Sequence, residues 1–278
     1  MPDQASSLRE LKRFIDHVSP EQLPGPEAFL TSLPSPTAFP AIALIVPDRV
    51  GSAIPPLQKW LPKLLPQRRP PTLWDQAATL SATTLLPDAS DRTPLMVKID
   101  SASGPLMALP RQIAPARLQM RPIQDRIRFL RQVQRLFAGS SEVWITIPMK
   151  DFRSHLSLVH ATDAAIVLVP HAQDAVLRCY EAVKAVHLSG YFSPISLAEM
   201  PDGNGLNPDK PAERIRLVAK QFLSLDLPPL GMVLSGIIPS SPTNPNGQNH
   251  QKPSIVPMYD FLHAFAERIL FPAPEDRQ

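Results

Sequence analysis

The stretch DAAIVLVPHAQDAVLRCYEAVKAVHL, residues 163–188, decides the fold class. Its apolar run at 164–169 is short and continuous, which is typical of a strand buried on both faces of a parallel sheet. Residues 174–187 follow with helical character, so a helix comes directly after the strand. A buried strand followed by a helix predicts a right-handed crossover unit of the βαβ type.

The same alternation extends to both sides of this stretch. Short apolar runs bounded by proline or polar residues predict the strands, and longer amphipathic segments predict the helices. We therefore expect an α/β protein with a mostly parallel sheet covered by helices on both faces. The predicted strands are 41–46, 95–99, 106–109, 143–147, 164–169, 194–198 and 230–234, and the predicted helices are 52–65, 123–137, 174–187, 212–223 and 258–270.

Composition narrows the class of protein. The chain has 278 residues, of which 44% are hydrophobic and 19% charged, as expected for a globular domain with one sizeable core. A net charge of +3 is too small for a typical nucleic-acid binder. Cys179 is the single cysteine, so no intrachain disulfide is possible and a cytoplasmic protein is expected. No apolar run reaches membrane-spanning length, and recruitment to the cell pole or the inner membrane surface is left open.

The N-terminal region differs from the core in its pattern. Residues 4–18 predict an amphipathic helix with Asp3 as its N-cap and an apolar stripe of Leu8, Leu11, Ile15 and Val18. Residues 19–40 contain repeated prolines and predict a tether, with one helical turn around 27–30. The expected organisation is a helix at 1–18, a tether at 19–40, an α/β domain at 41–271 with a mobile loop at 239–257, and a tail at 272–278.

The second half of the chain resembles the MinD/ParA family of deviant P-loop ATPases. The resemblance rests on QDRIRFLRQVQRLF before a strand that ends at Pro148, on HATDAAIVLVPHAQDAVLRCYEAVKAV, and on AERIRLVAKQFLSLDLPPLGMVL. It implies the MinD/ParA-like P-loop fold, and it is weakest between residues 41 and 110.

Residues 3–9, DQASSLR, resemble the DQAxxLR motif of the FlhG/FleN family of flagellar number regulators, which are MinD-like proteins. In that family the motif lies on a helix before the ATPase domain and stimulates FlhF, a GTPase of the signal-recognition-particle type. By this resemblance Gln4 would reach the GTP site, Leu8 and Leu11 would pack on the partner, and Arg9 would pair with its acidic surface. Asp3 and Ala5 complete the motif.

The nucleotide loop of that family is degenerate in this chain. A phosphate-binding loop needs glycines for close backbone approach, a lysine for the phosphates and a Ser or Thr for Mg²⁺. After the first predicted strand the family carries a KGGxGKT-like loop, whereas residues 47–53 read PDRVGSA. Arg49, Gly51 and Ser52 stand at this position, without a lysine and with one glycine.

A second family feature, the acid that helps to hold Mg²⁺, is also missing. The family's strand ends in Asp, an apolar residue and Pro, and here the matching residues are Thr146, Ile147 and Pro148. Without the acid and the lysine, phosphoryl transfer loses its main electrostatic stabilisation. We expect no ATP hydrolysis, no catalytic residue of its own and no cofactor, while weak binding of ATP and magnesium stays open.

Three other features have a plain structural interpretation that we favour. A basic run of arginines is either a docking surface for an acidic partner or membrane, or a solvated helix face. The helix at 258–270 is poor in cations, which favours packing in the core over membrane binding. His155, His160, His171 and His187 lack metal-ligand spacing, and Cys179 predicts a buried small apolar side chain. The basic run consists of Arg111, Arg117, Arg121, Arg126, Arg128, Arg131 and Arg135.

Two functions remain open from the sequence. The first is a FlhG-like regulator that activates an FlhF-type GTPase through residues 3–18, with a pseudo-ATPase core that could contact basal-body or polar proteins or form a homodimer. The second is a pseudo-ATPase adaptor of the MinD/ParA type in another positioning or secretion system, in which the DQAxxLR match is fortuitous.

Overall fold

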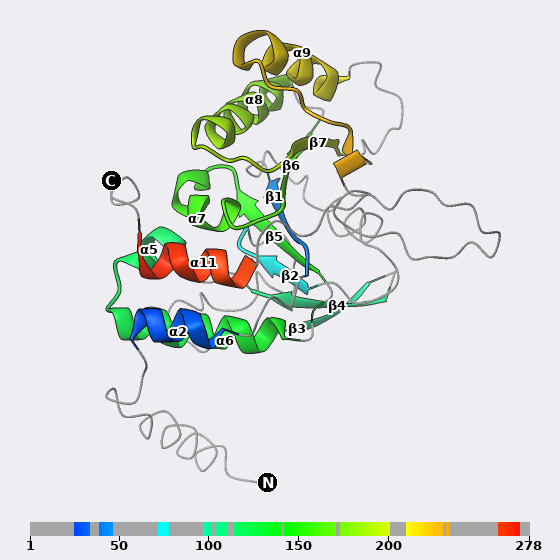
Figure 1. Ribbon diagram of the computed structural model, residues 1–278. Helices are drawn as coiled ribbons and strands as arrows, with labels where there is room; N and C mark the ends of the chain where they lie inside the picture. Colours follow the sequence, from blue (N-terminus) through cyan, green and yellow to red (C-terminus); the bar gives the residue numbers. More distant parts are fainter. Residues whose placement is uncertain are drawn as a thin grey trace, which may run out of the picture.

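A computed structural model of the chain describes residues 25–33, 39–46, 72–77, 97–101, 104–110, 114–138, 140, 142–170, 173–200, 210–230, 232–233 and 261–272. These residues form a single seven-stranded sheet with helices packed against it (Figure 1). The strand order is β3-β4-β2-β5-β1-β6-β7. Neighbouring strands are parallel except for the hairpin of β3 with β4, so the predicted α/β class with a mostly parallel sheet is confirmed. The strands are β1 (Ala41–Val46), β2 (Thr72–Asp75), β3 (Val97–Ser101), β4 (Gly104–Leu109), β5 (Val143–Pro148), β6 (Ala164–Val169) and β7 (Ile195–Glu199).

Both faces of the sheet are removed from solvent. In β1, Ala43 and Ile45 belong to one apolar core, and Ile42 and Leu44 belong to a second core on the opposite face. All four side chains are 0% exposed. The continuous apolar run of this strand was predicted to mean burial on both faces, and this is confirmed, since each face of the strand packs in an apolar core.

The described helices follow the alternation predicted from the sequence. α6 has the bounds expected for it, and α8, α9 and α11 lie within a few residues of their predicted ranges. In Figure 1, α8 and α9 lie beside β6 and β7, and α2, α5, α6 and α11 group together beyond β5 and β2. The helical elements are α2 (Pro26–Ser32), α5 (Pro115–Gln119), α6 (Ile123–Phe137), the 3₁₀ helix η3 (Phe152–His155), α7 (Leu156–Val159), α8 (Gln173–Leu188), α9 (Pro211–Leu223) and α11 (Phe261–Leu270).

An aromatic cluster fixes α11 to the sheet. Trp74 of β2 meets Phe265 of α11 and Phe137 of α6 edge to face, each with ring centroids 5.7 Å apart. Phe261 stacks on Phe265 at 6.0 Å, and all four rings are at most 1% exposed. The prediction that this helix packs in the core is therefore confirmed. Across the described residues, no helix combines the length and apolarity needed to cross a bilayer.

The predicted tether is interrupted by a helix that packs in the core. α2 begins at Pro26, and its Phe29 is 1% exposed. The guanidinium of Arg131 on α6 lies 6.0 Å from the centre of the Phe29 ring, which gives a cation–π contact. The single helical turn expected at 27–30 is thus part of a longer helix that belongs to the domain. The predicted helices at 4–18 and 52–65 lie outside the described residues.

The predicted strand at 230–234 is wrong where the structure describes it. Leu230 and residues 232–233 are helical, and the chain before them makes an isolated parallel bridge between Leu197 and Pro229. Pro228 and Pro229 carry no N–H and therefore cannot donate to a strand ladder. The Ser196 hydroxyl donates instead to the Pro228 carbonyl at 2.8 Å, so a side chain takes the place of a backbone bond beside β7.

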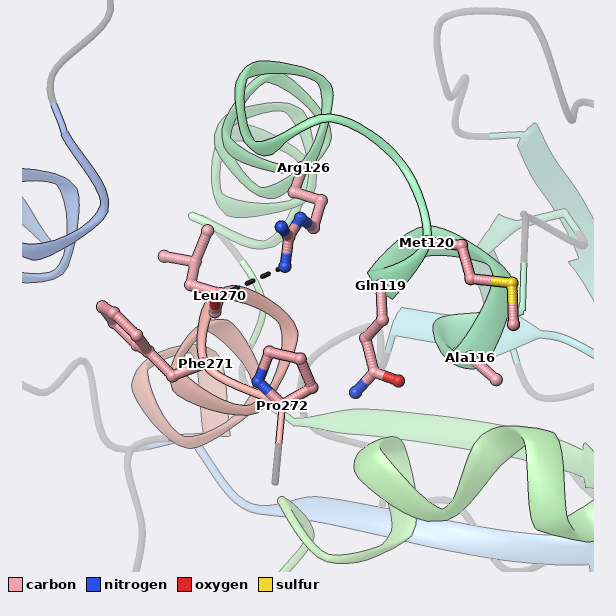
Figure 2. Close-up of a pocket in the computed structure, with 7 residues that line it drawn as sticks. All are labelled: Ala116, Gln119, Met120, Arg126, Leu270, Phe271 and Pro272. Atoms are coloured by element: carbon pink, nitrogen blue, oxygen red, sulfur yellow. Dashed lines mark hydrogen bonds between the residues drawn. The ribbon is translucent and has the colours of Figure 1, made fainter. Parts of the chain in front are cut away.

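Part of the basic run stabilises the end of α11. Arg126 of α6 donates to the Ile269 carbonyl at 2.9 Å and to the Leu270 carbonyl at 3.3 Å, and Figure 2 draws the second of these bonds. The Gln119 amide of α5 donates to the Arg268 carbonyl at 3.1 Å. The last carbonyls of a helix have no partner within the helix, so these donors act as its cap. The exposed Arg128 pairs with Asp125 at 3.4 Å. The solvated-face interpretation therefore describes Arg128, whereas Arg126 has a structural role that the sequence did not predict.

One buried carboxyl at the amino end of β5 predicts a pH-dependent stability. Glu142 is 3% exposed, and burial raises its pKa from 4.5 to about 7, with the neighbouring Trp144 side chain opposing the rise. Because the folded pKa lies above the unfolded one, the stabilisation is complete below pH 4.5 and is lost as the pH rises through 7. We expect Glu142→Gln to remove this loss, which amounts to about 3 kcal/mol.

Urea unfolding of the native chain and of Glu142→Gln at pH 5 and pH 8.5 measures the effect as a difference of differences. Exposed Glu267 lies on α11, and Glu267→Gln is the matched control. Equal pH dependence of the native chain and Glu142→Gln would show that Glu142 is ionised at no cost in the folded protein.

Candidate functional site at the carboxyl edge of the sheet

The topology identifies the edge at which a ligand would bind. From β1 the chain moves to β2, β3 and β4 on one side, returns through β5 beside β1, and crosses to β6 and β7 on the other side. β1 is therefore the point where the direction of winding reverses. In open α/β sheets, ligands bind beyond the carboxyl ends of the strands at such a point.

The predicted site residues fall at this edge or outside the described chain. Val46 ends β1 opposite Pro148 of β5 at the switch point, and it is the residue that precedes the segment 47–53 in the chain. Its candidate residues Arg49, Gly51 and Ser52 lie outside the described residues. So do the partner-activating candidates Asp3, Gln4, Ala5, Leu8, Arg9 and Leu11, whose roles stay predictions.

Thr146 is placed at the carboxyl edge, and both functions of its hydroxyl are used within the chain. Its Oγ1 donates to Oδ1 of Asp75 at 2.7 Å and accepts the backbone N–H of Ala77 at 3.1 Å. Thr146 pairs in register with Asp75 on β2 and with Leu44 on β1. Thr146 and Asp75 are both 0% exposed. The hydroxyl therefore ties the end of β2, and the turn that follows it, to β5.

The chemistry of this pair differs from that of a cation site. A threonine hydroxyl supplies one donor, and here that donor satisfies part of a buried carboxylate. An aspartate at position 146 would instead place two carboxylates at hydrogen-bond distance, an arrangement that needs a proton or a metal ion between them. In the part of the chain that the structure describes, no group of three or more His, Cys, Asp or Glu side chains is placed to hold a metal ion. The described residues thus do not fit an Mg²⁺ site.

Asp75 is the buried acid at this edge that sequence reasoning missed. It ends the four-residue strand TLWD, which follows Pro70 and Pro71 and was not predicted as a strand. The available signal was a short apolar run ending in an acid, as in strands whose carboxyl ends carry polar ligands. Its proximity to Thr146 could not be read from the sequence, because 71 residues separate the two in the chain.

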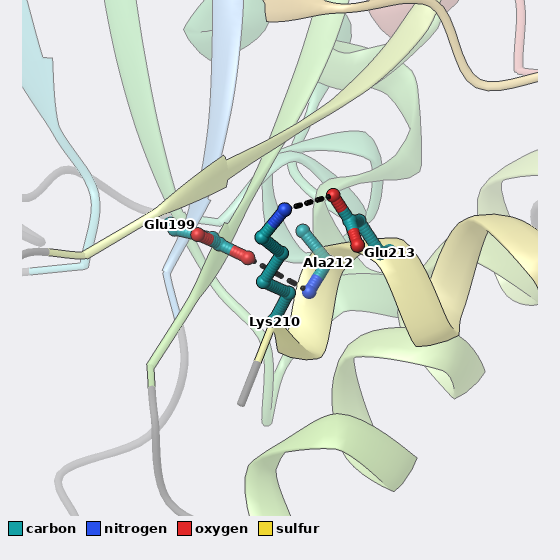
Figure 3. A network of polar contacts seen from close by, with 4 residues as sticks. All are labelled: Glu199, Lys210, Ala212 and Glu213. Atoms are coloured by element: carbon teal, nitrogen blue, oxygen red, sulfur yellow. Dashed lines mark hydrogen bonds and ion pairs between the residues drawn. The ribbon is translucent and has the colours of Figure 1, made fainter. Parts of the chain in front are cut away.

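A second carboxylate lies at the carboxyl end of the outer strand β7 and binds the start of α9. Glu199, at the end of β7, accepts the backbone N–H of Ala212 at 3.1 Å, and Lys210 pairs with Glu213 at 3.0 Å (Figure 3). The hydrogen bond and charge of Glu213 raise the pKa of Lys210. A helix N-terminus attracts anions through its unpaired N–H groups and its dipole. At α9 that position is filled by Glu199 from within the chain.

The remaining candidates are structural. Cys179 is 0% exposed, and burial raises the pKa of its thiol to about 12, so it is the buried small apolar side chain predicted for it. His155 is buried and contacts the Asp151 carbonyl at 2.9 Å, and His160 contacts the Ser189 hydroxyl at 2.8 Å. His171 lies outside the described residues.

Comparisons with known proteins were made for the sequence and for the fold. No known protein family and no curated protein matches the sequence. The fold is similar to that of the MinD cell division protein of Aquifex aeolicus, with 16% identity, coverage of 84% of this chain and 98% of that chain, and a TM-score of 0.41. It is also similar to a ParA family ATPase of Chlorobium tepidum, with 11% identity, coverage of 84% and 98%, and a TM-score of 0.43. A plasmid partition protein of Borrelia burgdorferi, solved with AMPPNP, has 15% identity, coverage of 66% and 83%, and a TM-score of 0.40.

Proposed function

We propose that this chain acts by binding partners and does not turn over ATP. The observation that carries the proposal is the buried pair of Thr146 and Asp75, in which a neutral hydroxyl stands where MinD/ParA-type chemistry would need a cation-holding acid. The PDRVGSA loop at 47–53 supports the same conclusion, because it has no lysine for the β- and γ-phosphates. In the described part of this edge, no group of three or more acids, histidines or cysteines is placed to hold a metal ion.

The proposed partner is a GTPase of the FlhF type, and the proposed role is FlhG-like regulation of flagellar number or placement. The support is the DQASSLR motif at residues 3–9, together with the mostly parallel α/β domain that follows it. Gln4 would orient the attacking water in the composite GTP site. Leu8 and Leu11 would pack against the partner, and Arg9 would pair with an acid on its surface.

A peptide of residues 1–20 added to the cognate FlhF tests this role through the rate of GTP turnover. We expect stimulation of roughly tenfold or more, since a single well-placed catalytic group supplies at least this much. Gln4→Ala should abolish the stimulation. Ser7→Ala changes a variable position of the motif and should keep it. Absence of stimulation, or equal stimulation by the Gln4→Ala peptide, would remove the flagellar assignment.

A further inference from the structure

A groove of about 730 Å³ lies between the segment after β5 and the helix α8. Its apolar lining comes from Met149 and Phe152 on one side and from Ala182, Ala185 and Leu188 of α8 on the other. Leu188 is 67% exposed although it lies at the groove, so a large apolar side chain faces water there. An apolar floor between two helical elements is the geometry in which a partner helix packs.

The exposed face of α8 continues this surface along the helix. Leu177, Glu181, Lys184 and Leu188 are all exposed and recur at the spacing of one helical stripe. Leu177 is 62% exposed, so the stripe presents an apolar side chain near each end and charged side chains between them. This pattern matches an amphipathic partner of about three helical turns, which spans roughly 16 Å.

The rim of the groove carries more positive than negative charge. Its cationic side chains are Lys150, Arg153, Arg178 and Lys184, and its acidic side chains are Asp151 and Glu181. Arg153 and Lys184 are exposed and make no ion pair with any other residue that the structure describes. A partner whose polar face is acidic would therefore be attracted to the rim while its apolar face covers the floor.

The groove is joined to the carboxyl edge of the sheet. Met149 directly follows Pro148, and its N–H donates to the carbonyl of Val46 at 2.8 Å. Val46 is the last described residue before the degenerate loop at 47–53. A partner seated in the groove would lie against the segment that continues from Thr146, so the groove borders the carboxyl edge of the sheet.

We propose that this groove binds an acidic amphipathic helix of a partner protein, with the apolar face of that helix against Met149, Ala185 and Leu188 and its acidic residues beside Arg153 and Lys184. This inference rests on the proposed function, in which the chain acts by binding partner proteins. It adds a second binding surface, on the folded domain, to the one proposed for residues 3–18.

The test uses the full-length chain and a defined probe. The probe is a fluorescein-labelled 18-residue peptide of Glu, Ala and Leu with the leucines on one helical face, and binding is followed by fluorescence anisotropy. A peptide with Lys at each Glu position is the charge control. We expect saturable binding of the acidic peptide, at least tenfold weaker binding of the basic one, and weakening by added salt because exposed charges are screened.

Three variants locate the binding surface. Lys184→Glu reverses a rim charge and Leu188→Ser removes the exposed apolar contact, and each should weaken the acidic peptide at least fivefold. Leu217→Ser changes an equally exposed leucine on α9, which lies outside the groove, and should leave the affinity unchanged. Thermal melts of the three variants confirm that each is folded.

Four results would contradict binding of an acidic helix in the groove. Absence of saturable binding, equal binding of the basic peptide, or unchanged affinity in both Lys184→Glu and Leu188→Ser would overturn the proposal. So would binding of phosphatidylglycerol vesicles that depends on Lys184 when the peptide does not bind. The GTPase assay uses residues 1–20 alone and does not involve the groove, so failure of one proposal leaves the other standing.

Discussion

We expect Thr146→Asp to lower the free energy of unfolding by about 3 to 5 kcal/mol at pH 7, because it places a second buried carboxylate beside Asp75. In the native chain the Thr146 hydroxyl donates to Oδ1 of Asp75 at 2.7 Å, and both residues are 0% exposed. Aspartate at 146 replaces a donor with a second acceptor that carries the same charge as its neighbour. Two buried carboxylates at this distance cannot both be ionised without a large penalty.

The matched control is Thr146→Asn, which has the shape of aspartate, carries no charge and can donate to Asp75. The difference between the Asp and Asn variants, measured by urea unfolding, isolates the charge. The deficit of the Asp variant should shrink as the pH falls, because a shared proton raises the folded pKa of the pair above the unfolded value. An Asp variant as stable as the Asn variant would mean that position 146 already has a compensating cation nearby.

The second large effect is expected for Phe265→Ala, which should lower the free energy of unfolding by about 3 to 5 kcal/mol. Phe265 is 1% exposed and packs edge-on against Trp74 and face-to-face on Phe261. Its removal leaves a cavity between α11 and the sheet, and the surrounding rings cannot collapse fully into it. Chemical unfolding followed by Trp fluorescence reports the loss directly, since Trp74 is one of the rings in contact.

Phe192→Ala provides the comparison for this variant. Phe192 is 88% exposed, so its removal should change the stability by no more than about 0.5 kcal/mol. If Phe265→Ala cost no more than Phe192→Ala, α11 would not be held in the core, and the interpretation of this helix as a membrane-binding element would regain its basis.

The strands that could be predicted are those with continuous apolar runs. β1, β5 and β6 are buried on both faces, so every residue in them had to be apolar or hydrogen-bonded, and the pattern was unambiguous. β2 is four residues long and includes polar Thr72 and Asp75, whose burial depends on partners in β5 and its neighbourhood. The predicted strand at 230–234 has a strand-like composition, but its described residues are helical, and Pro228 and Pro229 before it cannot donate to a ladder.

The residues of the candidate site also divide into those that a local sequence pattern reveals and those that depend on tertiary packing. Thr146 was found because the motif that ends its strand is local in sequence. Asp75 was not, because its role depends on β2 lying beside β5, and that strand order is set by the whole sheet. Arg126 and Glu199 follow the same rule, since each one caps a helix whose end is brought to it by tertiary packing.

Isothermal titration of the full-length chain with ATP in the presence of Mg²⁺ tests the central claim most directly. We expect no saturable heat of ATP binding up to roughly 1 mM ATP, a dissociation constant that corresponds to about −4 kcal/mol of binding free energy. Saturable, Mg²⁺-dependent binding that is weakened by Arg49→Ala or Thr146→Val would contradict it, since the carboxyl edge would then hold a nucleotide after all.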